Sequence, residues 1–200
     1  MSSQNEVIKV WCKCCNIQTN EEKCPICGSA TAEDTPIVIN WCRDCSIPII
    51  QEINQADKGI CPICGNRTLY LCRDIRPVFP EERLLIECLL GKKPNEFIRS
   101  SVWASNSRYY IDGKSYNISS KLFASADAEE LRQKICEAAE DNSHEHFDRY
   151  IDKFITANKR RLDFLKSEAF DFINQVVQRF PEENLVISFS GGKDSTVTAD

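Results

Sequence analysis

The residues best suited to chemistry are eight cysteines near the start of the chain, which occur in four pairs with the spacing Cys-x-x-Cys. Each pair can place two sulfurs on one tight turn, and two such turns supply four thiolate ligands to a tetrahedral metal ion. Four thiolates leave no open coordination position, so we expect structural sites rather than catalytic ones. The two sets of ligands are Cys12, Cys15, Cys24 and Cys27, and then Cys42, Cys45, Cys61 and Cys64.

The pattern around these cysteines occurs twice, which indicates an internal duplication. Each half begins with Trp-Cys-x-x-Cys and ends with Cys-Pro-Ile-Cys-Gly, and its two cysteine pairs, here called knuckles, are eight residues apart in the first half and fifteen in the second. Proline fixes φ and glycine tolerates a positive φ, as a tight metal-binding turn requires. The repeat predicts two zinc ribbons with one ion each, whose folding depends on the metal. Rubredoxin-like iron sites are the alternative, because iron accepts the same geometry.

Four further cysteines lie outside these sets. Cys14 offers a Cys-x-Cys alternative to the pair of Cys12 with Cys15, but the second half has Asp44 at the equivalent position, which favours Cys15. The other three lie in apolar or helical contexts and are interpreted as buried small hydrophobic residues: Cys72, Cys88 and Cys136.

The middle of the chain predicts a small module of mixed structure. A helix is expected to begin at Pro80 and to end just before Gly91, because proline suits its start and glycine lies just past its end. An Asp-Gly hairpin signal then joins β-rich segments, and we expect strands over 98–104, 108–111 and 114–118.

Two helices are expected in the following segment. A capping pattern that begins at Ser125 opens a helix to about residue 141, and Ser143 opens a much longer helix toward Phe180. Apolar residues recur along the longer helix at helical spacing, so one of its faces is expected to be buried.

The chain ends in a pattern that is typical of phosphate-binding loops. An apolar run over 184–189 predicts a strand, and it is followed by a glycine-rich loop and by residues that suit a helix. The glycines let backbone amides approach phosphate oxygens, and the start of the helix adds its dipole. The loop is not a Walker A loop, because its lysine is followed by aspartate. The candidate nucleotide-binding residues are Ser190, Gly191, Gly192, Lys193, Asp194 and Ser195.

The sequence FSGGKDS after an apolar strand resembles the signature loop of the ATP pyrophosphatases, and its setting is most similar to the phosphoadenosine-phosphosulfate reductase family. The resemblance implies a doubly wound α/β domain that binds ATP or phosphoadenosine phosphosulfate and acts at the α-phosphate, by adenylation or activated-sulfate chemistry. It also allows an iron–sulfur cluster beyond Asp200. Only the first strand, the loop and the start of the first helix of such a domain fall in this chain. We therefore expect the chain alone to be inactive, and we assign no catalytic residue.

Together these patterns predict a multi-domain α+β chain in five parts. The parts are zinc ribbon 1 (1–35), zinc ribbon 2 (36–75), a small α+β module (76–124), a helical segment (125–182) and the start of the nucleotide-binding domain (183–200).

Two other functions suit the same residues. One is a zinc-ribbon adaptor for nucleic acid or protein, and the other is an enzyme that transfers sulfur to RNA or DNA. Aromatic and basic side chains of the middle module suit a nucleic-acid surface, although cross-strand packing of the aromatic rings is the simpler interpretation. These side chains are Trp103, Tyr109, Tyr110, Tyr116, Arg99, Arg108, Lys114 and Lys121.

Composition and charge limit the partners and the cellular compartment that we expect for this chain. The net charge of -5 provides no general attraction to a polyanion, so a nucleic-acid partner would need a local basic patch. No apolar run approaches the length of a membrane span, and the chain does not start with a signal-peptide pattern. We therefore expect a cytoplasmic protein with no membrane partner.

Overall fold

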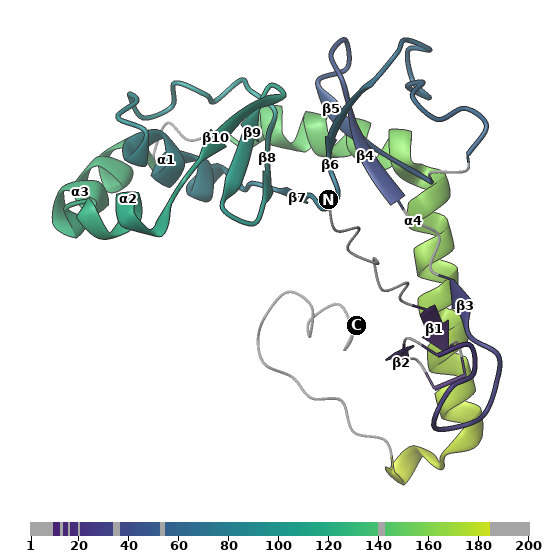
Figure 1. The fold of residues 1–200 in the computed structure, drawn as a ribbon. Coiled ribbons are helices and arrows are strands. Elements are labelled where there is room, and N and C mark those ends of the chain that lie inside the picture. The colour runs from purple at the N-terminus through teal and green to yellow at the C-terminus, as the bar shows by residue number, and fades with distance from the viewer. Residues whose placement is uncertain are drawn as a thin grey trace, which may run out of the picture. The chain divides into compact units, whose positions relative to one another are not determined.

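The computed structural model describes residues 10–12, 14, 15, 17–19, 21–33, 37–52, 55–139 and 143–184. They form a mixed α and β structure with three small antiparallel sheets (Figure 1), which confirms this part of the expected fold class. The chain divides into two compact units, Met1–Glu33 with Leu162–Asp200, and Asp34–Arg161. The phosphate-binding loop and the helix expected after it lie outside the described residues, and the five domain boundaries remain predictions.

The first cysteine-rich module, ribbon 1, is built on a three-stranded sheet. Strand β1 (Val10–Cys12) lies between β2 (Ile17–Thr19) and β3 (Ala32–Glu33). Because Cys12 is opposite Ile17 in the β1–β2 pairing, the first knuckle occupies the turn between these two strands.

The second module, ribbon 2, repeats this arrangement. Strand β4 (Ile37–Cys42) lies between β5 (Ile47–Glu52) and β6 (Leu69–Cys72), so the middle strand again carries the first cysteine of the set. Cys42 is opposite Ile47, as Cys12 is opposite Ile17. The duplication seen in the sequence therefore extends to strand order and register.

A buried glutamine organises the longer connection of ribbon 2. The Oε1 atom of Gln51 accepts hydrogen bonds from the side-chain amide of Asn40 and from the backbone amide of Gly59, each at 2.8 Å. Its Nε2 atom donates to the carbonyl of Ile60 at 3.0 Å. Every polar atom of this buried side chain has a partner, so the glutamine fixes the entry to the second knuckle.

A four-stranded sheet follows, in the order β10-β9-β8-β7. Its strands are β7 (Arg76–Pro77), β8 (Val102–Ser105), β9 (Arg108–Ile111) and β10 (Lys114–Asn117). The expected hairpin is confirmed, because β9 pairs with β10 through a turn in which Asp112 and Gly113 both have positive φ, 48° and 78°. Such a pair of positive φ angles is typical of a type I′ turn.

Helix α1 (Pro80–Leu89) has the expected start and end, with proline in the first turn and Gly91 at φ 67° just past the end. It contains a buried ion pair, because Nη1 of Arg83 donates to Oε1 of Glu87 at 2.6 Å and the Glu87 side chain is fully buried. One turn of helix separates the two residues.

The same carboxylate explains why one expected strand is shorter than predicted. Glu87 also accepts hydrogen bonds from the backbone amides of Asn95 and Phe97, at 2.6 and 2.7 Å. Residues 94–100 therefore form a series of turns instead of pairing in a sheet. The strand expected over 98–104 begins only at Val102.

Two helices occupy the segment where one was expected to begin at Ser125. Helix α2 (Ser120–Ser125) was not expected, and Ser125 is its last residue. Helix α3 (Ala128–Ala139) begins three residues later because Asp127 caps it, with Oδ1 accepting from the amides of Glu129 and Glu130 at 2.9 and 3.0 Å.

Helix α4 (Glu145–Arg179) is the long helix that the sequence predicted, and the Oγ atom of Ser143 accepts from the amide of Glu145 at 3.2 Å. It is followed by a 3-10 turn, Glu182–Asn184, so Asn184 does not begin the strand expected over 184–189. The expectation of one buried face is wrong for the second half of α4. In the structure six apolar side chains of this half are 40% exposed or more: Phe164, Leu165, Phe170, Phe172, Ile173 and Val177.

Within the unit Asp34–Arg161, ribbon 2, the four-stranded sheet and the first half of α4 share one hydrophobic cluster. Trp41 of ribbon 2 belongs to the same cluster as Trp103 and Tyr110, and the rings of Trp103 and Phe154 lie 4.7 Å apart. Trp103 is opposite Tyr110 in the β8–β9 pairing, and their exposed fractions are only 1% and 5%. These two rings therefore pack across strands and do not offer a stacking surface to nucleic acid.

One polar residue of α4 joins this helix to ribbon 2. The Oδ1 atom of Asn158 accepts from the amide of Ile50 at 2.6 Å, and its Nδ2 atom donates to the carbonyl of Pro48 at 3.1 Å. Both partners lie on β5, which is an edge strand of its sheet. Among the described residues of α4, Asn158 alone is buried.

Candidate metal centres

The structure brings together each set of four cysteines that the sequence singled out. In ribbon 1 the sulfurs of Cys12, Cys15, Cys24 and Cys27 all lie within 4.8 Å of one another. The Sγ atoms of Cys12 and Cys27 are 3.6 Å apart. This set is called quartet 1.

Quartet 2, in ribbon 2, has the same arrangement. The sulfurs of Cys42, Cys45, Cys61 and Cys64 also lie within 4.8 Å of one another. The Sγ atoms of Cys42 and Cys64 are 3.5 Å apart, and those of Cys45 and Cys61 are 3.8 Å apart. In a tetrahedral site with metal–sulfur bonds of about 2.3 Å the sulfurs are about 3.8 Å from one another, so both quartets fit such a site.

Backbone hydrogen bonds hold the first knuckle of each ribbon. The amide of Cys15 donates to the sulfur of Cys12, and the amide of Cys45 donates to the sulfur of Cys42, both at 3.4 Å. The Cys-x-x-Cys spacing thus bends the chain so that the third amide after a cysteine points back at its sulfur.

The second knuckle of each ribbon is closed by a glycine turn. Gly28 and Gly65 have φ angles of 70° and 73°, and each amide donates to the carbonyl of the residue four positions earlier, at 2.9 Å. A side chain other than hydrogen is strained at such a φ, which is the physical reason for glycine in Cys-Pro-Ile-Cys-Gly.

Local hydrogen bonds also affect the acidity of the thiols. Bonds from the hydroxyl and the amide of Ser29 lower the pKa of Cys27 to about 6, and a bond from the amide of Asn66 lowers the pKa of Cys64. Burial raises the pKa of Cys42 to about 11. Each second knuckle therefore ends in a thiol that its own turn favours as thiolate, the form that binds metal.

The other cysteines take no part in the two quartets. Cys14 is exposed, in agreement with the choice of Cys15 as the partner of Cys12. Of the three cysteines expected to be buried, Cys72 is buried and Cys88 is half-buried. The expectation is wrong for Cys136, because α3 buries none of its side chains.

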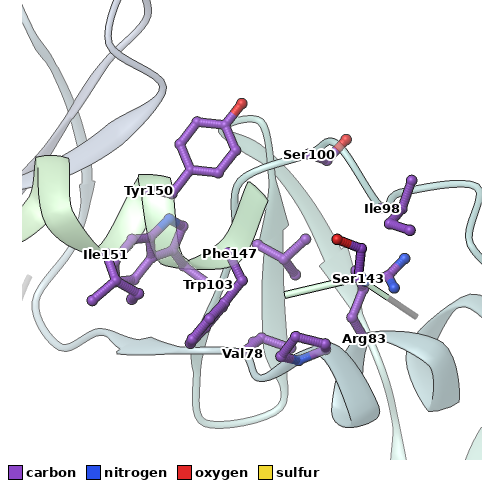
Figure 2. Close-up of a pocket in the computed structure, with 11 residues that line it drawn as sticks. Val78, Arg83, Ile98, Ser100, Trp103, Ser143, Phe147, Tyr150 and Ile151 are labelled. Carbon is purple, nitrogen blue, oxygen red and sulfur yellow. The ribbon is translucent and has the colours of Figure 1, made fainter. Parts of the chain in front are cut away.

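A small cavity lies between the four-stranded sheet, α1 and the start of α4 (Figure 2). Its volume is about 20 Å³, enough for about one water molecule, and apolar side chains such as Val78, Trp103 and Phe147 form much of its wall. The guanidinium of Arg83 at its edge already donates to Glu87 and Asn95. Because its volume is only about 20 Å³, the cavity is too small for a nucleotide.

The structural findings define the class of protein as far as the described chain allows: a mixed α and β protein with two four-cysteine centres that fit zinc ribbons. None of its described helices is long and apolar enough to cross a membrane. Comparisons with protein-family models, with curated proteins and with solved structures gave no match. The sequence-predicted nucleotide-binding residues, Ser190, Gly191, Gly192, Lys193, Asp194 and Ser195, lie outside the described residues.

Proposed function

We propose that both quartets hold zinc as a structural ion, and that the chain contributes a phosphate-binding loop to an enzyme that acts on an adenine nucleotide. The enzyme would be an ATP pyrophosphatase similar to phosphoadenosine-phosphosulfate reductases. The observation that carries this proposal is the sequence FSGGKDS at 189–195, which follows an apolar run. The ribbons would serve to dock a substrate or a partner.

The zinc part rests on the chemistry of the donors. Each quartet offers four sulfurs within 4.8 Å and contains no carboxylate or imidazole. Thiolate sets of this kind suit zinc, and they leave no coordination position for a substrate. Zinc supplies a cross-link that a small module needs in order to fold, because such a module cannot bury enough apolar surface by itself.

The nucleotide part assigns a role to each kind of residue in the loop. The amides of Gly191 and Gly192 would approach the phosphate oxygens, since no side chain blocks them. The ammonium group of Lys193 and the hydroxyl of Ser195 would donate to the same anion. The α-phosphate would then be held for adenylation or activated-sulfate chemistry.

Titration of ATP and of phosphoadenosine phosphosulfate against the full-length protein tests this role. Lys193→Ala removes a charge-assisted contact worth roughly 1.5 to 3 kcal/mol, so affinity should fall about ten- to a hundredfold. Gly192→Val keeps the charge but blocks the backbone, and it should abolish binding. If Lys193→Ala binds both nucleotides as tightly as the wild type, the proposed phosphate contact is wrong.

An adaptor function is the second candidate, and it is favoured by apolar side chains on the ribbons. The isoleucine of each Cys-Pro-Ile-Cys knuckle is exposed, Ile26 by 71% and Ile63 by 44%, and Tyr70 on β6 is exposed by 62%. Where exposed apolar side chains form a contiguous patch, they mark a docking surface. A wild-type protein that retains zinc but binds neither nucleotide would favour this function over the first.

A further inference from the structure

Quartet 2 lies inside a hydrophobic cluster that includes part of α4. Three of its cysteines are buried together with two isoleucines of β5, and Tyr150 and Ala157 of α4 pack against this cluster. The helix therefore contacts the ribbon at its metal centre. The buried members of the cluster are Cys42, Cys45, Ile47, Ile49 and Cys61.

The hydrogen bonds of Asn158 lie beside this cluster. Asn158 follows Ala157 directly, and its partners Pro48 and Ile50 alternate along β5 with the buried Ile47 and Ile49. Strand β5 begins two residues after Cys45, so the knuckle fixes its start. Helix α4 packs on the face of β5 that carries Ile47 and Ile49, and Asn158 binds the backbone at its edge. Both contacts therefore depend on the geometry of the knuckle.

From these contacts we infer that the metal ion of quartet 2 controls the docking of the first half of α4, residues 145–161, on ribbon 2. Without the ion, nothing cross-links the two knuckles, and the ordered β5 that Asn158 binds loses its anchor. Coupling between two binding equilibria is reciprocal, so the docked helix also raises the affinity of quartet 2 for the ion. This inference rests on the zinc part of the proposed function.

Hydrogen exchange measured by mass spectrometry tests the first direction of this coupling. Cys61→Ser removes a ligand of quartet 2, and amide exchange over 145–161 should become about tenfold faster or more, because the helix opens locally. Cys24→Ser is the matched control, since Cys24 is the equivalent buried ligand of quartet 1. It should leave the exchange of 145–161 unchanged.

Equilibrium competition for zinc with a colorimetric chelator tests the reciprocal direction in a protein with both quartets intact. Asn158→Ala leaves the amide of Ile50 without its acceptor, and one of the two ions should be bound about tenfold more weakly. Asn174→Ala, which changes an exposed asparagine of the same helix, is the control and should bind both ions with the wild-type affinities.

The outcomes separate this inference from the function on which it rests. A wild-type protein that retains no zinc overturns the zinc proposal and this inference together. If the wild type holds two zinc ions and Asn158→Ala binds them with the wild-type affinities, the inference alone is overturned. The inference alone is also overturned if Cys61→Ser speeds amide exchange over ribbon 2 but not over 145–161.

Discussion

The indole ring of Trp41 lies directly against the backbone of Gly113, so closely that a β-carbon at position 113 would be 2.6 Å from Nε1 of the tryptophan. The Trp-Cys motif of ribbon 2 thus contacts the tip of the β9–β10 hairpin. Glycine is needed there for two reasons, the positive φ of the turn and the absence of space for a side chain.

Gly113→Ala should therefore destabilise the protein by more than the strain of its φ angle. We expect about 1 kcal/mol from the positive φ and about 1 to 3 kcal/mol more from the forced displacement of the ring. Gly59→Ala is the control, because Gly59 has a similar φ of 85° and no atom within 4 Å of the added carbon. Urea unfolding at a fixed zinc concentration measures both. Equal losses in the two variants would show that the contact with Trp41 contributes nothing.

Cys14 and Cys15 should differ sharply in their effect on metal content. Cys15→Ser removes a member of quartet 1 and should reduce the zinc content from two ions per chain to one, whereas Cys14→Ser should retain two. Elemental analysis of the purified proteins gives these numbers directly. One ion in Cys14→Ser would mean that Cys14 is a ligand, and iron in place of zinc would favour the rubredoxin-like alternative.

Two glutamates of α1 should contribute very different amounts to stability. Glu87→Ala leaves the guanidinium of Arg83 buried without its carboxylate, which typically costs about 3 to 5 kcal/mol. Glu82→Ala is the comparison, since Glu82 also accepts from an arginine, Arg76, but that pair is partly exposed and should contribute about 1 kcal/mol or less. Unfolding in urea separates the two cases. Similar losses in the free energy of unfolding would show that burial does not increase the contribution of Glu87 to stability.

The cap of α3 provides a local test of the helix boundary. Asp127→Ala should cost about 1 kcal/mol, because two amides of the first turn lose their acceptor. Ser125→Ala should cost less, since its hydroxyl only donates to the carbonyl of Leu122 at the end of α2. Thermal unfolding of the two variants under one set of conditions makes the comparison, and a larger effect of Ser125→Ala would contradict the observed boundary.

The features that the sequence predicted correctly depend on residues close together in the chain. The cysteine pairs, the start of α1 at Pro80 and the Asp112–Gly113 turn are each set by a few neighbouring side chains. The features that it missed depend on distant partners. Nothing near Asn158 indicates that it binds Ile50, which is 108 positions earlier.

Competition from other side chains explains two of the wrong expectations. Residues from Ile98 onward suit a strand by composition, but Glu87 has already taken the amides of Asn95 and Phe97. Ser125 suits a helix cap, but α2 incorporates it and Asp127 takes that role instead. The expected strand that precedes the nucleotide loop, and the loop itself, stay predictions.

The position of Asn158 also bears on how copies of this chain behave toward one another. An edge strand with free amides and carbonyls is a template on which a strand from a second molecule can add, which is a common beginning of aggregation. Asn158 occupies both the amide of Ile50 and the carbonyl of Pro48, the groups that an incoming strand would need on β5. The side chain that holds α4 on ribbon 2 thus also prevents a strand of a second molecule from pairing with β5 at high protein concentration.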